Sequence, residues 1–400
     1  MNTSARPTLS HAFAEALPEL VREARGADFP EPRLVVLNEP LARELGLDPE
    51  WLRTPEGAAW LTGAGGGHAT AYAGHQFGQF VPVLGDGRAL LLGDIGGREI
   101  QLKGSGPTPF SRPGSDGFGA IGPMLREFLV SGFMHAVGVP TTRSLAVVDT
   151  GAKVLRQQGA VPGGVLARVA RSHLRVGTVQ YAATHSAALV NKVVAAAGAD
   201  EPGQLLEAVV DRQIELVVRW MRLGFVHGVM NTDNTALSGE TIDYGPCAFT
   251  ERFLAGASFS SVDTGGRYAF GNQPNVIAWN LTRLAEALLP VMEQPEAEAI
   301  LATLQQRWDH YWERHFAGAE GIDEAEDITT FNREHGGGPI FIPRNRMLDA
   351  ALTAAERDGD YGPYTELLAA VTDPFNPEAG PSWMAEPEGD EGPFVTYCGT

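Results

Sequence analysis

The stretch HGVMNTDNTALSGETIDYG, residues 227–245, places two asparagines, two aspartates and a histidine around a short predicted turn. Residues 235–237 and 240–242 are short strand candidates, and Ser238-Gly239 between them is typical of a two-residue hairpin loop. Such a loop pairs residue 237 with residue 240 and extends the ladder outward on both sides. The register of this predicted hairpin decides which polar side chains face one another.

In that register, Asn234 lies opposite Asp243. Directly paired residues have Cβ atoms about 5 Å apart, close enough for an amide oxygen and a carboxylate to bind one hard cation. This predicts a Mg²⁺ or Mn²⁺ site, completed by phosphate oxygens and water. Asp233 points away from the ladder and is free to accept a proton from a hydroxyl. The alternative is a polar turn whose side chains bond local backbone groups, and His227 fits a structural hydrogen bond better than a general base.

Upstream of this stretch, the chain carries further residues suited to phosphate chemistry. Gly85 and Gly87, within VPVLGDGRALLLGDI, let backbone N–H groups approach phosphates, and Arg88 adds positive charge. Lys103 ends a predicted strand in REIQLKGSG, and Glu127 on the next helix can fix its ammonium. The alternative interpretation of Glu127 is a solvated carboxylate on the helix surface, which would be expected if Lys103 were absent. A glycine loop, a strand lysine, a helix glutamate, then Asp-Asn and Asp-Tyr-Gly are the ordered parts of protein-kinase-like folds.

Arg168 and Arg175 flank a basic cluster, RVARSHLR, in an otherwise acidic protein. Guanidinium groups bind phosphate oxygens well, so the cluster suits a triphosphate. A surface patch without a ligand is the alternative interpretation. The stretch YAGHQFGQF, residues 72–80, is expected to pack on the sheet and support the glycine loop, without chemistry of its own.

Composition limits the classes of partner. The 400 residues include 30 basic and 49 acidic ones, a formal charge of −19, so the overall field repels nucleic acids and anionic membranes. No apolar run reaches the roughly 18 residues of a membrane span, and the start lacks the pattern of a signal peptide. Two cysteines are too few for a disulfide-built fold. We expect a monomer in the bacterial cytoplasm, with no nucleic acid or membrane partner.

Helical and strand patterns along the chain predict an α+β, protein-kinase-like, two-lobed fold. Apolar periodicity is clearest at residues 205–223, which form an amphipathic helix. Strands are expected at 146–155 and 163–170, and further helices at 13–25, 123–138, 276–290, 294–315, 346–356 and 363–371. The predicted divisions are an N-terminal extension (1–70), an N-lobe (71–150), a C-lobe (151–315), and a shortened C-terminal helical region with a tail (316–400).

The chain resembles the selenoprotein O family, also called SelO or YdiU, whose members are kinase-like protein nucleotidyltransferases. The resemblance spans nearly the whole chain. It is carried by the ordered blocks YAGHQFGQFVPVLGDGRALLLGDI, REIQLKGSGPTPFSR, LREFL, VLARVARSHLRVGT, HGVMNTDN, TIDYGPCAF, GRYAFGNQP, WNLTRLAEAL, IPRN and YCGT.

The resemblance implies that ATP binds in a flipped orientation and presents its α-phosphate, so that AMP is transferred to Ser, Thr or Tyr hydroxyls of acceptor proteins. Some members also use UTP with Mn²⁺. By motif match, Asp233 is implied as the catalytic base, and Asn234 and Asp243 as the ligands of Mg²⁺ or Mn²⁺. The residues implied to line the nucleotide are Gly85, Gly87, Arg88, Lys103, Asp116, Gly117, Arg168, Arg175 and Asp243, with Glu127 holding Lys103.

Two features depart from the family pattern. Relatives often carry a basic residue after the Asp-Gly pair, where this chain has Phe118, and this removes one phosphate contact. The segment between Phe316 and Ile340 is shorter than in relatives, so part of the C-terminal helical region is expected to be missing.

The two cysteines suggest a redox hypothesis. Cys398 stands where some relatives carry selenocysteine, and Cys247 follows the Asp-Tyr-Gly sequence. A disulfide between them would pin the tail over the activation-loop region. Two free thiols in a reducing cytosol are the alternative.

Two rival functions use the same residues. Every one of them could also serve ordinary kinase-type transfer of the γ-phosphoryl group, and a non-catalytic ATP-binding scaffold is the rival from another class. The joint presence of a base, two metal ligands and a lysine–glutamate pair favours catalysis.

Overall fold

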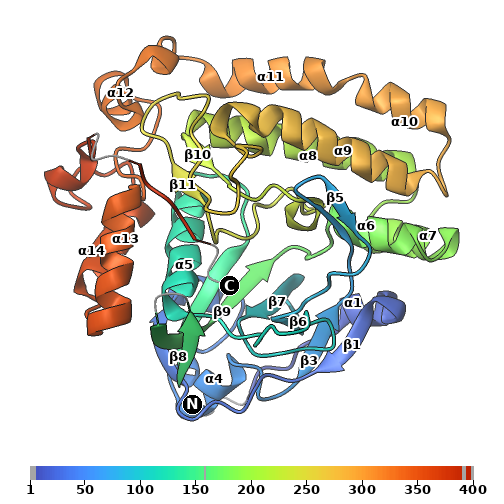
Figure 1. The fold of residues 1–400 in the computed structure, drawn as a ribbon, viewed down its shortest axis with the longest axis horizontal. Coiled ribbons are helices and arrows are strands. Elements are labelled where there is room, and N and C mark those ends of the chain that lie inside the picture. Colours follow the sequence, from blue (N-terminus) through green and yellow to red (C-terminus); the bar gives the residue numbers. More distant parts are fainter. Residues whose placement is uncertain (1–5, 157–158, 390–392, 398–400) are drawn as a thin grey trace.

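The computed structural model describes residues 6–156, 159–389 and 393–397. Its largest element is a seven-stranded antiparallel sheet in the order β1-β3-β6-β7-β9-β8-β2 (Figure 1). The strands are β1 (Val21–Ala24), β2 (Arg33–Leu37), β3 (Gly67–Thr70), β6 (Ala89–Ile95), β7 (Arg98–Lys103), β8 (Arg143–Arg156) and β9 (Gly159–Ala170).

Alternation of side chains along β7 separates two environments. Ile100 and Leu102 are buried in an apolar cluster formed with the helices of the N-terminal segment, whereas Glu99, Gln101 and Lys103 belong to the opposite, polar set. The covering helices are α2 (Glu39–Glu44), α3 (Pro49–Leu52) and α4 (Pro55–Trp60). The first 70 residues therefore supply three strands of the sheet and the helices that cover one of its faces.

The predicted helix at 13–25 is wrong beyond its first turn. Helix α1 spans Ala12–Ala16, a 3-10 turn spans Pro18–Leu20, and β1 follows. Pro18 has no backbone N–H to continue a helix, and the residues of β1 instead pair with β3, with Val21 opposite Thr70.

Helices cover the other side of the sheet and build the rest of the molecule (Figure 1). Helix α5 (Ile121–Ala136) packs on β8 and β9, and α14 (Gly362–Thr372) and α13 (Asn345–Thr353) pack on α5. The remaining helices are α6 (Val176–Ala183), α7 (Ala187–Ala196), α8 (Pro202–Arg222), α9 (Gln273–Leu288), α10 (Gln294–Leu301), α11 (Leu304–Phe316) and α12 (Ile328–His335). No helix in the described part of the chain is long and apolar enough to cross a membrane.

The predicted helices at 123–138, 205–223, 276–290, 346–356 and 363–371 are confirmed within a few residues. The helix expected at 294–315 is broken at Ala302-Thr303 into α10 and α11, and α6 and α7 were not predicted. The boundary predicted at residue 150 falls inside β8. Because β8 and β9 form one hairpin, with Arg156 opposite Gly159, the sheet region continues to Ala170.

Two small ribbons lie outside the large sheet. Strands β10 (Phe225–Val226) and β11 (Ala248–Phe249) pair with each other, as do β4 (Gly74–Gln76) and β5 (Gln79–Val81). The β4–β5 ribbon leaves the sheet and reaches the helical region near α6 and α9 (Figure 1). The fold is thus a mixed α and β fold with one large antiparallel sheet, and its kinase-like, two-lobed character stays a prediction at this point.

Candidate active site

A buried ion cluster joins the sheet, helix α5 and the Asp-Tyr-Gly segment. Lys103 is the last residue of β7, and its Nζ pairs with Glu127 Oε1 and lies 2.7 Å from Asp243 Oδ1. The side chains of Lys103 and Glu127 are 7% and 3% exposed. Removing one member of such a cluster leaves a buried charge without its partner, which destabilises the folded protein by about 3–5 kcal/mol. The predicted partnership of Lys103 with Glu127 is therefore present, and Asp243 is its third member.

Asp243 has an unusual backbone. Its φ of 69° lies in the left-handed region, which residues other than glycine rarely adopt and which stores strain at functional sites. Burial alone would raise the pKa of its carboxyl group, but the ammonium of Lys103 and the guanidinium groups of Arg88 and Arg168 hold that pKa well below its usual range. Asp243 is therefore a carboxylate at neutral pH.

The predicted hairpin between 235–237 and 240–242 is wrong. Ala236 bridges to Arg175 and Thr241 bridges to Thr141, so both halves pair with distant parts of the chain. Ser238 Oγ donates to Glu240 Oε2 instead of closing a two-residue loop. The ladder that was expected to set Asn234 opposite Asp243 does not exist, and a shared metal ion at these residues cannot rest on that register.

Asp233 lies in a 3-10 turn, Thr232–Asn234, and only 8% of the residue is exposed. Gln76 Nε2 donates to Asp233 Oδ2 at 3.3 Å, while Oδ1 is buried without a hydrogen-bond partner in the structure. Burial raises the pKa of Asp233 to about 6, against the opposing effects of a backbone N–H, Arg175 and Gln76. A carboxylate with a pKa near neutrality is suited to general base catalysis.

The amide of Asn234 is oriented by a bond from Nδ2 to the Val229 carbonyl, 3.0 Å long. This bond leaves Oδ1 as the atom for a cation. The described residues contain no group of three or more His, Cys, Asp or Glu side chains placed to hold a metal. Mg²⁺ is commonly bound by one or two protein oxygens plus phosphates and waters, so Asn234 with the ionised Asp243 fits such an ion.

Arg168 and Arg175 lie in a buried network with two polar residues that the sequence did not single out. Arg168, on β9, donates from Nε and Nη2 to Gln101 Oε1 at 3.1 and 2.6 Å, and Gln101 Nε2 donates to Asp86 Oδ2 at 3.0 Å. Arg175 Nη2 lies 3.8 Å from Asp86 Oδ1, and neither atom has a hydrogen-bond partner among the described residues. The two arginines are therefore brought together in the interior, and the surface-patch alternative is wrong.

Arg175 also connects this network to the turn that carries Asp233. Its Nη1 donates to the Asp233 carbonyl at 3.0 Å, and its Cζ lies 4.5 Å from the centroid of the Tyr72 ring. As the residue before α6, Arg175 has an N–H that bonds Thr178 Oγ1, which fixes the start of the helix. One arginine thus touches the glycine loop, through Asp86, and the Asp233 turn.

The backbone N–H groups of both loop glycines, Gly85 and Gly87, already form hydrogen bonds within the protein. The N–H of Gly85 donates to the Tyr72 carbonyl at 3.2 Å, and that of Gly87 donates to the Gly85 carbonyl at 2.9 Å. Gly85 has a φ of 66°, and a Cβ there would lie 2.4 Å from the Phe110 ring, so glycine is required. A phosphate contact from these N–H groups would therefore require exchange of internal hydrogen bonds.

Asp116 and Gly117 lie on the loop between β7 and α5. Asp116 is exposed, and its Oδ2 accepts from Arg156 Nη1 at 2.9 Å. Gly117 is buried with a φ of 72°, and a Cβ there would lie 2.4 Å from the backbone of Pro107. Phe118 packs its ring edge-on against Phe29, with centroids 5.9 Å apart, so it serves the packing of this loop rather than phosphate contact.

The stretch 72–80 was predicted to pack on the sheet and support the glycine loop, and the Tyr72 carbonyl does accept the N–H of Gly85; the rest of the stretch has a different position. Its β4–β5 ribbon contacts the Asp233 turn: the His75 N–H donates to Thr232 Oγ1 at 2.6 Å and the Phe77 N–H to Asn231 Oδ1 at 3.2 Å. Gln76 in addition accepts from Arg112 Nη2 at 2.8 Å. The predicted structural role of His227 is confirmed, because its Nε2 bonds the Ile242 carbonyl at 3.0 Å.

Of the predicted redox pair, Cys247 is buried and Cys398 lies outside the described residues. Burial raises the pKa of the Cys247 thiol to about 12. The tail does reach this region, since Thr396 Oγ1 donates to the Pro246 carbonyl at 2.6 Å and its N–H to the Phe259 carbonyl at 2.7 Å. The disulfide itself stays a prediction.

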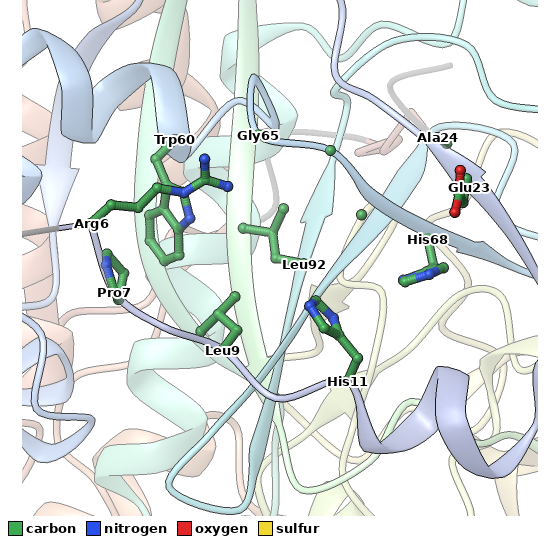
Figure 2. A pocket seen from close by; sticks show the side chains of 12 residues that line it. Arg6, Pro7, Leu9, His11, Glu23, Ala24, Trp60, Gly65, His68 and Leu92 are labelled. Carbon is green, nitrogen blue, oxygen red and sulfur yellow. The ribbon is translucent and has the colours of Figure 1, made fainter.

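A separate cavity of about 370 Å³ lies between the N-terminal segment and strands β1, β3 and β6 (Figure 2). Arg6, Trp60 and Leu92 line it, with His11 and His68, whose ring centroids are 5.6 Å apart. None of the residues predicted to bind nucleotide or metal lines this cavity, so we assign it no part in the chemistry.

Comparison with known proteins identifies the family of this chain. A family model described as "Protein adenylyltransferase SelO" matches residues 8–335. The chain belongs to this family.

Several curated relatives bear the name "Protein nucleotidyltransferase YdiU". The one from Mycolicibacterium paratuberculosis is 45% identical, over 98% of this chain and 98% of its own length. The one from Corynebacterium efficiens is 43% identical, over 99% of this chain and 97% of its own. The alignment with a Mycolicibacterium smegmatis relative covers all of both proteins and extends over 485 positions, against 400 residues here. This chain is therefore shorter than that relative, as predicted, although the place of the shortening stays a prediction.

Proposed function

We propose that this protein is a protein nucleotidyltransferase that transfers AMP from ATP to Ser, Thr or Tyr hydroxyls of acceptor proteins and releases pyrophosphate. UTP is a second donor in the same reaction. The observation that carries the proposal is the position of Asp233: a buried carboxylate with a pKa raised to about 6, on a turn whose backbone carbonyl accepts a hydrogen bond from the buried Arg175. Family membership supports the same reaction.

Asp233 acts as the base. Its free Oδ1 accepts the proton of the acceptor hydroxyl while the hydroxyl oxygen forms a bond to the α-phosphorus. The bond from that phosphorus to the bridging oxygen breaks, and the electron pair leaves with pyrophosphate. Because the reaction develops charge on phosphate oxygens, groups that are fixed before the reaction stabilise it most.

Lys103, Arg88, Arg168 and Arg175 supply that fixed positive charge. Lys103 is held by Glu127, and Arg168 is held by Gln101, so neither has to be ordered when the nucleotide binds. Gly85, Gly87, Asp116 and Gly117 complete the nucleotide site. We infer the flipped orientation of ATP and the kinase-like, two-lobed arrangement from the order of these parts and from the buried arginine pair.

Asn234 and Asp243 would hold Mg²⁺ or Mn²⁺, because their oxygens form the hard donor set in this part of the site. When bound, the ion neutralises phosphate charge. Lys103 fixes Asp243 for this role through the 2.7 Å contact.

The test is incubation of the protein with a bacterial lysate and ATP labelled at the α- or the γ-phosphate. The proposal predicts α-label on protein and no γ-label, and loss of the label with Asp233→Asn. Asp373→Asn, at an exposed carboxylate far from the site in sequence, is the matched control and keeps wild-type labelling. Label only from the γ-position would make the protein a kinase, and no label from either would favour the scaffold.

A further inference from the structure

Aromatic and arginine side chains gather beside the Asp233 turn, and the proposed nucleotide chemistry uses none of them. The set consists of Phe77 and Phe80 of the β4–β5 ribbon, Arg267, and Trp279 and Arg283 of α9, and we call it the aromatic–arginine face. Both guanidinium groups lie against Trp279: the Cζ atoms of Arg267 and Arg283 are 4.9 and 5.0 Å from its ring centroid.

His75 joins the ribbon to α9. Its ring centroid lies 4.9 Å from that of Phe80 and 5.1 Å from that of Trp279. The Phe77 ring in turn packs on Tyr268, the neighbour of Arg267, with centroids 5.2 Å apart. These contacts join the ribbon, the segment around 267 and α9 to one another, and Figure 1 shows β5 near α9.

This surface is fixed to the proposed base. The ribbon residue between His75 and Phe77 is Gln76, whose side chain donates to Asp233, and the flanking N–H groups bond the turn that carries Asp233. Phe77 adopts a φ of 51°, a strained conformation that these bonds maintain. A polypeptide lying on the face would therefore be held at a constant distance from the base.

The exposed part of the face combines apolar surface with positive charge. Phe77 and Phe80 are 39% and 43% exposed. The Arg267 guanidinium forms no ion pair in the described part of the chain, and the neighbouring Asp263 carboxylate is buried, where it accepts the backbone N–H groups of Arg267 and Tyr268. Arg283 Nη2 lies 2.6 Å from the carboxylate of Glu286, the acidic residue of α9. Phe, Trp and Arg are enriched at the centres of protein interfaces. In a chain of net charge −19, a locally positive surface attracts the acidic segments that the rest of the molecule repels.

We propose that the aromatic–arginine face docks the acceptor polypeptide, and that it selects segments with carboxylate and apolar side chains next to the hydroxyl that is modified. The proposal rests on the proposed nucleotidyl transfer, because it names the substrate class of that same site. Arginines attract the carboxylates and orient the segment, whereas the two phenylalanines bury its apolar side chains.

The test uses two synthetic peptides, each with one tyrosine between leucines, one flanked by aspartates and the other by lysines. The readout is the kcat/KM for transfer of α-label from ATP. Wild type is expected to favour the acidic peptide about tenfold or more, and Arg267→Glu to remove that preference. Phe80→Ser is expected to lower kcat/KM about fivefold for the acidic peptide, mainly through KM, with ATP affinity unchanged. Phe80 gives a second variant that does not alter charge.

Arg314→Glu on α11 and Phe375→Ser are the matched controls, since both side chains are exposed outside the face, and both are expected to match wild type. Equal labelling of the two peptides by wild type, or labelling of neither while lysate proteins are labelled, overturns the docking proposal. So do face variants that behave like the controls. Absence of α-label on every protein, lysate included, refutes the nucleotidyl transfer itself and is thereby distinguished from failure of the docking proposal.

Discussion

Replacement of Gln76 by leucine tests how the β4–β5 ribbon acts on Asp233. The change removes the Nε2 donor that lies 3.3 Å from Asp233 Oδ2 and keeps a side chain of similar volume. A hydrogen bond to a charged group contributes about 1.5–3 kcal/mol, and this long one is assigned about 1 kcal/mol. Since one pKa unit corresponds to 1.36 kcal/mol, the pKa of Asp233 should rise by roughly 0.7 units from its value of about 6.

The sign of the effect on activity follows from the role of the base. As the proposed base, Asp233 must be deprotonated, so the transfer rate is expected to rise with pH through about 6 and level off above it. A higher pKa moves this acid limb upward by roughly 0.7 pH units in the Gln76→Leu variant, which lowers the rate about threefold near pH 6 and hardly at all near pH 8.

The assay is the pH profile of kcat/KM for α-label transfer, with Gln79→Leu on the exposed part of the same ribbon as the control. The control should keep the wild-type profile. An unchanged acid limb in Gln76→Leu, or a loss of rate that is the same at every pH, would refute the coupling between Gln76 and the base.

Two further substitutions test the packing around the site and in the C-terminal region. Gly74→Ala would place a Cβ 2.5 Å from Asp233 Oδ1. Transfer should therefore fall at least tenfold, and the free energy of unfolding should fall by about 1–3 kcal/mol. Gly256→Ala is the control, because a Cβ there meets nothing within 4 Å, and it should change neither quantity. Both are measured by α-label transfer and by urea unfolding. Arg344→Met should lower the free energy of unfolding by about 3–5 kcal/mol, because it leaves Asp327 buried without its 3.1 Å partner. A loss below 1 kcal/mol in urea unfolding would contradict that reasoning.

The parts of the site that follow one another along regular elements could be predicted from sequence. Lys103 ends a strand and Glu127 lies on the next helix, and their pairing is present. A further signal was available in the same strand: Glu99, Gln101 and Lys103 alternate with Ile100 and Leu102, so a polar face of β7 was readable from the two-residue period. Following it would have found Gln101 as the partner of Arg168.

Other parts depend on contacts between residues far apart in sequence. The Ser238-Gly239 pair is typical of a hairpin, yet its flanks bond residues 175 and 141, more than 60 positions away. Asp86 and Gln76 are unremarkable in sequence, because their roles arise only when the glycine loop meets Arg175 and when the ribbon meets the Asp233 turn. Tertiary pairing of this kind overrides local turn preference.

The central claim is that the acceptor hydroxyl attacks ATP at the α-phosphorus, so that AMP is transferred. The measurement that tests it most directly is mass spectrometry of an acceptor protein after reaction with unlabelled ATP and either wild type or Asp233→Asn. An adenylyl increment on a Ser, Thr or Tyr residue, present with wild type and absent with Asp233→Asn, is the predicted result. A phosphoryl increment, or an adenylyl increment that persists in Asp233→Asn at the wild-type rate, would contradict it.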